Sequence, residues 1–207
     1  MIELFLSAFT TFFVVIDPPG SAPIFAGLTR GTDATHRRAM AIRSTLLAGA
    51  ILFIFALIGQ PLLTMLGISL NAFRIAGGIM LFLIALEMVF EKHTQKREGQ
   101  IQEVALHPEQ YEDISVFPMA IPMIAGPGSI TSAMLLTQRS DGLAEHMVVL
   151  GALAAVMALL LASLLAAAPM MRVIGQKPEA VITRLLGVLL AALAAQFVID
   201  GIHGAFL

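Results

Sequence analysis

Cysteine is absent from the 207 residues of this sequence. The chain therefore forms no disulfide, has no thiol nucleophile and offers no thiolate ligand to a metal ion. Charged side chains are also scarce, since Asp, Glu, Lys and Arg make up 13% of the residues, about half of the roughly 25% usual in soluble domains. Hydrophobic residues reach 58%, and a soluble fold of this size has too little interior to bury them. Composition alone therefore indicates a membrane protein.

The apolar residues are grouped into six long stretches. A helix needs roughly 20 residues to cross about 30 Å of hydrocarbon, and each stretch reaches about this length. The sequence therefore predicts an all-α membrane protein with six transmembrane helices, at residues 4–28, 40–58, 68–90, 114–136, 147–168 and 180–202.

One polar segment interrupts this pattern. Residues 91–113, EKHTQKREGQIQEVALHPEQYED, are long and polar enough to form a solvated loop. The spans use nearly all the rest, so we expect a single transmembrane domain over residues 1–207, in which the loop separates repeat 1 (1–90) from repeat 2 (114–207). The N-terminal sequence MIELFLSAFTTFF lacks a basic region and a small-residue cleavage site, so we expect it to be retained as the first span.

Basic residues predict the orientation of the spans, because short loops rich in Lys and Arg stay in the cytoplasm. Two of the twelve, Arg74 and Arg139, lie on one side of the predicted membrane. The other ten share the side of the polar loop, and they are Arg30, Arg37, Arg38, Arg43, Lys92, Lys96, Arg97, Arg172, Lys177 and Arg184. We therefore expect a multi-pass protein of a bacterial-type inner (plasma) membrane, with a cytoplasmic loop and with both termini outside, in the periplasm.

The two halves of the chain share short motifs. The triplet PGS at residues 19–21 recurs 108 residues later at 127–129, and LT at 28–29 recurs with the same spacing at 136–137. The spaced pair R-x-x-G at Arg74 recurs 110 residues later at Arg184. Each half has an odd number of spans, so the second half must enter the membrane with the opposite orientation. The sequence therefore predicts a 3+3 inverted-topology repeat.

The shared PGS motif lies near the middle of the first and fourth spans, within DPPGS (17–21) and AGPGS (125–129). Proline removes a backbone donor and glycine adds backbone freedom, so we expect helices 1 and 4 to be broken near mid-membrane. Two broken helices at matching positions indicate a transporter site at the bilayer midplane. A pair of packing kinks is the alternative, because proline is frequent in membrane helices.

The same motifs resemble those of a known family. FFVVIDPPGSAPIF and PMIAGPGSITSAM, in a six-span chain of 207 residues, are similar to the MarC family of integral membrane proteins, and the likeness covers essentially the whole chain. The family name records an association with multiple antibiotic resistance. The resemblance also implies transport of small neutral amino acids, because some relatives are regarded as transporters of this kind.

Asp17 has two interpretations. An aspartate followed by a proline has the order of a helix N-cap and a first helical residue, so its carboxylate would cap the second half of the first span. An ionisable group inside a span is also costly, and it usually faces a cavity, a partner or an ion path. The two roles are compatible.

A broken helix can receive both charges of a zwitterion, because it presents free N–H groups at one half-helix end and free carbonyls at the other. We expect the solute carboxylate near Ser21 or Ser129 and its ammonium near Asp17 or the carbonyls. Ala125 stands where Asp17 has its counterpart, so one carboxylate serves the site. The predicted substrate-binding residues are Asp17, Pro19, Gly20, Ser21, Gly126, Gly128, Ser129, Thr131 and Ser132.

The hydroxyl groups of this set have a second interpretation, since serine and threonine in membrane helices often bond their own backbone. A proton or a sodium ion is the candidate coupling ion, and we expect no other cofactor and no metal. The expected partners are the lipid bilayer and a small zwitterionic solute, with no nucleic acid.

Four further polar residues fall within the predicted spans. Arg74 and Asp200 share the outer depth and Glu87 and Arg184 the inner one, so an outer and an inner ion pair could join the halves as gates. Snorkelling of long side chains to the interface is the alternative.

Small residues form a stripe on the fifth span, and such stripes let helix backbones approach closely. We expect this stripe to pack within the chain, while a homo-oligomer stays open. Its members are Gly151, Ala155, Ala158, Ala162 and Ala166.

The function predicted from these features is secondary transport of a small polar solute by alternating access, most simply a small neutral amino acid, and not an enzyme activity. Export of drugs or metabolites and a non-transporting membrane scaffold are alternatives. An intramembrane serine hydrolase would use Ser129 as nucleophile and His203 as base, but His203 lies at the outer end of the sixth span, far from a mid-span serine.

Overall fold

The computed structural model describes residues 1–90, 113–140, 142–174 and 177–206, with side chains described outside 168–182. Within these ranges the chain is helical and has no strand. The helical elements are α1 (Ile2–Ile16), α2 (Pro18–Leu28), α3 (Ala34–Met65), α4 (Leu70–Val89), η2 (Ser115–Ile124), α6 (Pro127–Gln138), α7 (Leu143–Ile174) and α8 (Lys177–Phe206).

The prediction of an all-helical membrane protein is confirmed. In the described residues, five helical segments are long and apolar enough to cross a membrane, or six if Ser115–Ile124 and Pro127–Gln138, bent by 54°, count as one span. α3 and α7 extend several residues beyond the predicted spans at both ends, because hydropathy detects only the apolar part of a helix. The predicted loop lies outside the described residues, apart from Asp113.

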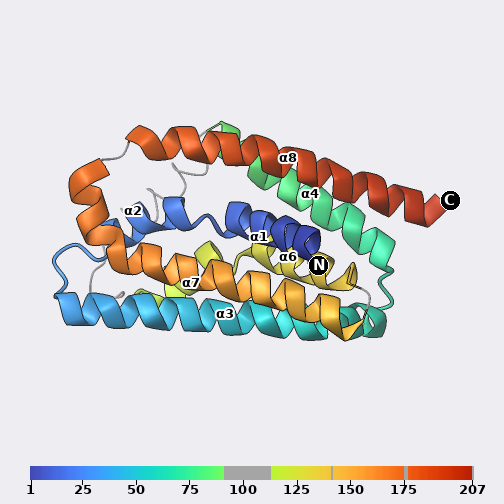
Figure 1. The fold of residues 1–207 in the computed structure, drawn as a ribbon, viewed down its shortest axis with the longest axis horizontal. Coiled ribbons are helices and arrows are strands. Elements are labelled where there is room, and N and C mark those ends of the chain that lie inside the picture. The colour runs from blue at the N-terminus through green and yellow to red at the C-terminus, as the bar shows by residue number, and fades with distance from the viewer. Residues whose placement is uncertain (91–112, 141, 175–176, 207) are drawn as a thin grey trace.

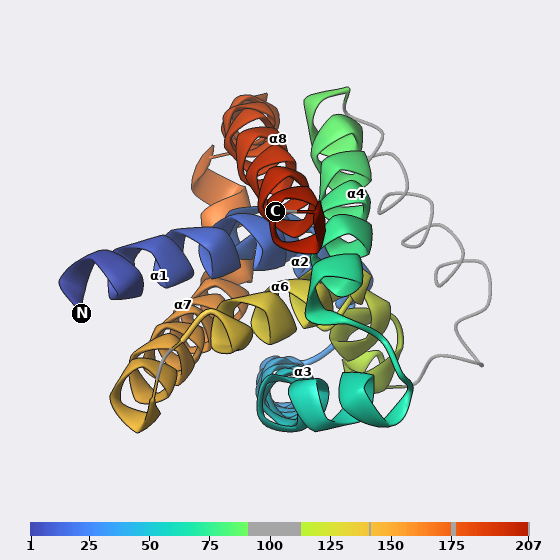
Figure 2. The same cartoon turned by 90° about the vertical axis from the view of Figure 1, so that its right-hand side faces the viewer.

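Both termini lie toward the same end of the molecule, together with the end of α3 and the start of α7 (Figure 1). α4 and α8 run side by side along one edge (Figure 2). Glycines allow this close approach, since a Cβ added at Gly78 would lie 2.8 Å from the Ala194 carbonyl oxygen and one at Gly201 2.9 Å from the Asn71 carbonyl oxygen. Small residues serve the same purpose in many membrane helix pairs.

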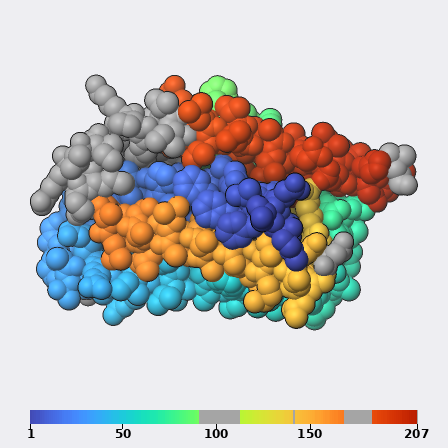
Figure 3. Space-filling view, viewed as in Figure 1, coloured from blue at the N-terminus to red at the C-terminus, as the bar shows by residue number. Residues whose placement is uncertain are grey.

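The remaining helices form the main core. α2 and α1 both pack against α7, while α6 and η2 both pack against α3. α1 reaches the surface between α7 and α8 (Figure 3). The largest side chains buried in this core include Phe12, Phe25, Leu52, Leu153 and Leu160. A smaller cluster, which includes Leu81, Leu135 and Phe197, joins α4 and α8 to α1 and α6.

The expectation that the small-residue stripe packs within the chain is wrong. Gly151, Ala158, Ala162 and Ala166 are exposed and Ala155 is half-buried. The buried face of α7 is instead the one that carries larger apolar residues, including Leu153, Val156, Leu160 and Leu164. Burial of the larger side chains removes more apolar area and therefore decides which face of the helix turns inward.

Candidate functional site

The first span is interrupted at Asp17. α1 ends at Ile16 and α2 begins at Pro18, and Asp17 between them has the left-handed backbone angles φ 51° and ψ 66°. Aspartate tolerates this conformation better than most residues, and the following proline keeps Asp17 out of the right-handed helical region. Asp17 is 1% exposed. Its Oδ1 accepts a hydrogen bond from the backbone N–H of Gly20 at 3.1 Å, so the capping interpretation is confirmed.

The second interruption lies between η2 and α6. Gly126 precedes the first residue of α6, Pro127, and no side chain caps this helix start. A Cβ added at Gly126 would lie 2.4 Å from the Pro122 carbonyl oxygen, so the chain can turn here only with glycine. Ala125, which corresponds to Asp17 in the second half, is buried and apolar. The second interruption therefore has no carboxylate at the matching position.

η2 is less regular than the sequence analysis expected. Phe117 and Ile121 have extended backbone angles inside it, at φ −124° and −130°. Each precedes a proline, and a residue before proline is biased toward extended backbone. Pro118 and Pro122 in the sequence therefore indicate these two extended residues. The hydropathy pattern, which reads the segment as one continuous span, does not indicate them.

The start of α6 lies beside the end of α1. A Cβ added at Gly128 would lie 2.5 Å from Ile84 Cδ1 and 3.4 Å from Val15 Cγ1. Val15 is two residues from Asp17, so the two interruptions, which are 108 residues apart in sequence, are neighbours in the fold. Sequence spacing suggested that they correspond, but only the fold brings them together.

The predicted site residues are almost all buried around these interruptions. Ser21 and Ser132 are fully buried, Ser129 is 3% exposed and Thr131 is 6% exposed. Gly20, Gly126 and Gly128 are also buried, and Pro19 is half-buried.

Their hydroxyl groups behave differently from one another. Ser21 Oγ donates to the Ile16 carbonyl oxygen at 3.4 Å, so this hydroxyl bonds its own backbone. Thr131 presses on α4, since its Cγ2 lies 2.4 Å from a Cβ added at Gly77. Ser132 Oγ is buried and has no hydrogen-bond partner among the described residues, which marks it as a group still able to bind a ligand.

Two cavities are described, and one of them reaches α1 at Val14, three residues before Asp17. One, of about 360 Å³, lies between α1 and α8 and is lined mainly by Leu6, Ser7, Thr10, Leu189 and Leu193. The other, of about 560 Å³, lies between α3, α6 and α7. Neither is lined by Asp17, Ser129 or Ser132, which are buried among the surrounding helices.

The polar residue Asp200 pairs with Arg139, not with Arg74 as the sequence analysis predicted. Gln196 Nε2 also donates to Asp200 Oδ1 at 2.6 Å. Arg74 is close to this group, because its Cβ lies 3.1 Å from a Cβ added at Gly201, and its buried Nε has no hydrogen-bond partner among the described residues. The predicted depth of Asp200 in the membrane indicated the correct end of the molecule for its partner. It did not indicate that Arg139, at the end of α6, is the residue that reaches α8.

Glu87 and Arg184 lie on the two helices of the α4–α8 pair. A Cβ added at Gly187 would lie 2.9 Å from Met88 Cβ and 3.1 Å from the Ala85 carbonyl oxygen. Arg184 is therefore about one helical turn from the level of Glu87. An ion pair between them stays a prediction.

The geometry is unfavourable for the hydrolase alternative. Ser129 follows Gly128, where an added Cβ would lie 3.4 Å from Leu81 Cδ2 of α4. His203 precedes Gly204, where an added Cβ would lie 2.7 Å from Asn71 Oδ1 of the same helix. These two levels of α4 are ten residues apart, about 15 Å along its axis. A general base must lie within about 3 Å of the proton that it takes.

Asp113 and Arg43 tie the other end of the bundle together. Arg43 Nη1 lies 2.8 Å from Asp113 Oδ2, and both the backbone N–H and the hydroxyl of Ser115 donate to Asp113 Oδ1. The Ser115 hydroxyl and the Arg43 guanidinium hold the pKa of Asp113 below its ordinary value of 3.8. These contacts fix the start of η2 against α3.

The described helices are long and apolar, and they expose large hydrophobic side chains over much of their surface. They surround a buried aspartate at an interrupted span. These features define an integral membrane protein. Within that class, the chain belongs to the MarC family of integral membrane proteins, whose match covers residues 2–206.

Relatives match the chain along its whole length. A UPF0056 membrane protein of Archaeoglobus fulgidus is 35% identical over 97% of this chain and 93% of its own length. The UPF0056 membrane protein YvbG of Bacillus subtilis is 35% identical over 100% of this chain and 97% of its own. The UPF0056 inner membrane protein YhgN of Escherichia coli is 31% identical over 96% of this chain and 95% of its own. No solved structure matches the chain.

Proposed function

We propose that this protein is a secondary transporter of the inner membrane that moves a small neutral amino acid by alternating access. The observation that carries the proposal is the meeting of two interrupted spans, where Gly128 at the start of α6 lies against Val15 near the end of α1. Substrate sites of secondary transporters are typically formed by discontinuous helices from two repeats that meet near the bilayer midplane.

We further propose that the two halves form a 3+3 inverted-topology repeat with helices 1 and 4 broken near mid-membrane. The pattern of helix packing supports this. α2 packs on α7 as α6 packs on α3, and α1 packs on α7 as η2 packs on α3. Under the repeat, α1 corresponds to η2, α2 to α6 and α3 to α7, so each contact has its counterpart in the other half.

The two helix starts differ in a way that suits a zwitterion. The start of α2 is capped by the carboxylate of Asp17, whereas no side chain caps the start of α6. Uncapped N–H groups at a helix start attract anions. In the proposed complex the solute carboxylate binds at the start of α6 near Ser129, and the ammonium binds Asp17. The Ser132 hydroxyl, which lacks a partner among the described residues, completes the polar shell.

The enclosed position of these residues fits a transporter between its two open states. Solute would enter from the periplasm and leave to the cytoplasm, or the reverse, as helices move around the interruptions. A proton or sodium ion bound at Asp17 is the proposed driving ion. The Escherichia coli relative is named as an inner membrane protein, and we propose the same membrane here, with both termini outside and no enzyme activity.

Export of a drug or metabolite would use the same interruptions and differs only in the solute. The test is uptake and counterflow of radiolabelled glycine, alanine and serine in proteoliposomes, with and without proton and sodium gradients. We expect gradient-dependent accumulation of at least one of them, and competition by unlabelled amino acid. If none accumulates or exchanges while other compounds do, the amino acid assignment is wrong.

A matched pair of variants separates the site from helix capping. Asp33 is also an N-cap aspartate, with Oδ1 accepting from the backbone N–H groups of Thr35 and His36 at 2.8 and 3.0 Å, but it is exposed at the start of α3. We expect Asp17→Asn to abolish transport and Asp33→Asn to leave it unchanged. Equal flux through both variants would remove Asp17 from the site.

A further inference from the structure

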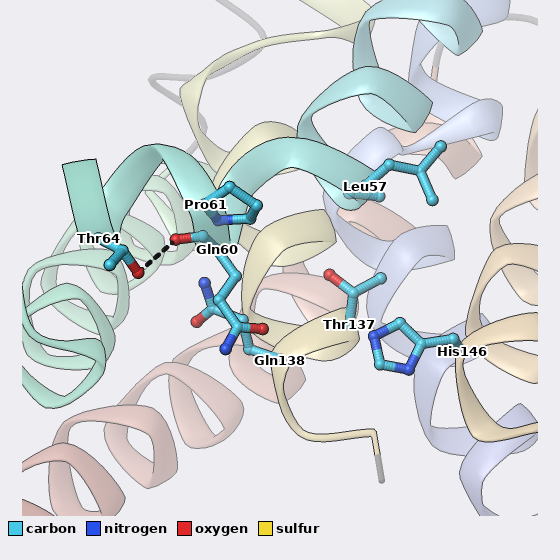
Figure 4. Close-up of a pocket in the computed structure, with 8 residues that line it drawn as sticks. Leu57, Gln60, Pro61, Thr64, Thr137, Gln138 and His146 are labelled. Carbon is cyan, nitrogen blue, oxygen red and sulfur yellow. Dashed lines mark hydrogen bonds between the residues drawn. The ribbon is translucent and has the colours of Figure 1, made fainter. Parts of the chain in front are cut away.

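The cavity of about 560 Å³ at the end of the molecule that carries the termini has the size of a small-molecule site, for which roughly 300 to 1,000 Å³ is usual. It is formed by the end of α3, the end of α6 and the start of α7 (Figure 4). Its lining residues are Ala56, Leu57, Gln60, Pro61, Thr64, Thr137, Gln138 and His146. Gln138 ends α6 and Pro127 begins it, so about 16 Å of helix separates this cavity from the interruptions.

Gln138 carries the strongest indication that the cavity binds a ligand. Both its amide nitrogen and its carbonyl oxygen are buried, and neither has a hydrogen-bond partner among the described residues. Burial of a polar atom without a hydrogen-bond partner is costly, so such atoms favour a ligand that can pair with them.

Two other groups in the cavity complement Gln138. The Gln60 side chain extends toward Gln138 in the cavity (Figure 4). His146 Nδ1 lies 3.0 Å from the Gly142 carbonyl oxygen, which can only accept, so Nδ1 carries the proton and Nε2 of the neutral ring is an acceptor. The ring extends toward Thr137 (Figure 4).

The remaining polar groups of the lining are already engaged. Thr137 Oγ1 donates to the Ala133 carbonyl oxygen at 2.8 Å, and Thr64 Oγ1 to the Gln60 carbonyl oxygen at 3.0 Å. Among the described residues that line the cavity there is no aspartate, glutamate, lysine or arginine. The groups left for a ligand are therefore two carboxamides and an imidazole nitrogen, beside apolar contacts from Ala56, Leu57 and Pro61.

We propose that this cavity is a binding site for a small neutral solute that carries a carboxamide. A carboxamide presents an acceptor and a donor side by side, so it pairs with both amide atoms of Gln138 once this side chain turns toward the cavity. A charged group would be desolvated in the cavity without an opposite charge to compensate it among the described lining residues. The site is separate from the interrupted spans, and its existence does not depend on transport.

The absence of cysteine makes a direct test available. Thr64 is exposed on the cavity wall and bonds only its own helix through its hydroxyl, so Thr64→Cys places a thiol there with little change in volume. In detergent, its rate of modification by a maleimide is measured with N-acetylglycinamide, N-acetylglycinate or glycinamide present. These probes are of similar size and are neutral, anionic and cationic in turn.

We expect only N-acetylglycinamide to protect the thiol, by about threefold at twice its Kd, because the free fraction falls as 1/(1 + [L]/Kd). Gln138→Leu in the same background should abolish protection, and Gln60→Leu, at an exposed position, should weaken it. Leu66→Cys, on an exposed residue outside the cavity, is the control that should show no protection.

Several results would overturn the proposal. These are no protection by N-acetylglycinamide, equal protection by all three probes, protection that persists in both Gln138→Leu and Gln60→Leu, or equal protection at position 66. Because no amino acid flux is measured, failure here is distinct from failure of the transport proposal.

Discussion

Asp200 on α8 and Arg139 at the end of α6 form an ion pair. The Arg139 guanidinium also lies over the Phe197 ring, 4.5 Å from its centroid. Both paired side chains are about one-third exposed, at 32% and 31%. The pair connects the α4–α8 edge of the molecule to the helix that begins at the second interruption.

Breaking this pair should destabilise the protein. We expect Asp200→Asn or Arg139→Gln to cost about 1 kcal/mol, between the roughly 0 to 1 kcal/mol of exposed pairs and the larger cost of breaking a buried one. A double-mutant cycle on unfolding in mixed detergent micelles should give a coupling energy of similar size. Arg74→Gln is the control, and a larger coupling of Asp200 with Arg74 than with Arg139 would contradict the structure.

Gly78 should be intolerant of any side chain. A Cβ there would lie 2.8 Å from the Ala194 carbonyl oxygen and 3.0 Å from the Val198 backbone nitrogen, and neither atom can move without shifting α8. We expect Gly78→Ala to cost about 1 to 3 kcal/mol. Gly151→Ala is the matched control, because nothing lies within 4 Å of its added Cβ and alanine favours the helix by about 0.5 to 1 kcal/mol. Equal effects of the two substitutions would show that the α4–α8 contact is looser than described.

Local chemistry explains how much of the fold could be predicted from the sequence. The spans follow from apolar length, and the interruptions at Asp17 and Gly126 follow from proline and glycine, which act within a few residues. The N-cap role of Asp17 was likewise readable from the proline that follows it. Each of these features depends on neighbours in sequence.

The features that were missed depend on contacts between helices. The partner of Asp200 is Arg139 and not Arg74 because the end of α6 reaches α8, a fact that no local pattern contains. The exposed stripe on α7 carries small residues that suit close packing, yet the opposite face buries more apolar area. The cavity at Gln138 joins three helices and has no sequence motif at all.

Acid should weaken the contact between Asp113 and Arg43. The pKa of Asp113 is lower in the folded protein than its ordinary value of 3.8, so its contribution to stability is complete above that ordinary value and is lost as pH falls through the folded value. We expect this contribution to be constant from about pH 7 to pH 5 and to decline below about pH 4. Solvent screening keeps it small, because the Asp113 side chain is 38% exposed.

The measurement is the thermal stability of wild type and Asp113→Asn across this range. The wild type should be the more stable at neutral pH, and the difference should shrink in acid. A difference that grows as pH falls would contradict the depressed pKa.

The orientation proposed for the membrane can be tested with two single cysteines. Leu66 and Phe90 are 63% and 66% exposed. Leu66 caps the end of α3, just before α4 begins, and Phe90 caps the end of α4, whose 20 residues span about 30 Å. In intact cells an impermeant maleimide should label Leu66→Cys and spare Phe90→Cys, and permeabilised cells should label both. Labelling of position 90 alone would place both termini in the cytoplasm.

Substitutions at Asp17 should separate its backbone, capping and charge roles. Asparagine keeps a capping oxygen and tolerates the left-handed backbone, so Asp17→Asn should unfold within about 0.5 kcal/mol of wild type. Asp17→Ala loses the cap, and alanine also disfavours the φ of 51° at this position. It should therefore cost about 2 kcal/mol, roughly half from each effect. Asp17→Gly loses the cap but accepts this φ freely, and should cost only about 0.3 kcal/mol.

The resulting order of stability places Asp, Asn and Gly above Ala, and it is set by the interruption alone. Transport should follow a different order, because only aspartate carries the charge that binds an ammonium or a coupling cation, and all three variants should be inactive. Chemical unfolding and proteoliposome flux on the same preparations compare the two orders. If flux instead follows stability, so that Asp17→Asn transports at the wild-type rate, the carboxylate serves the helix and not the solute.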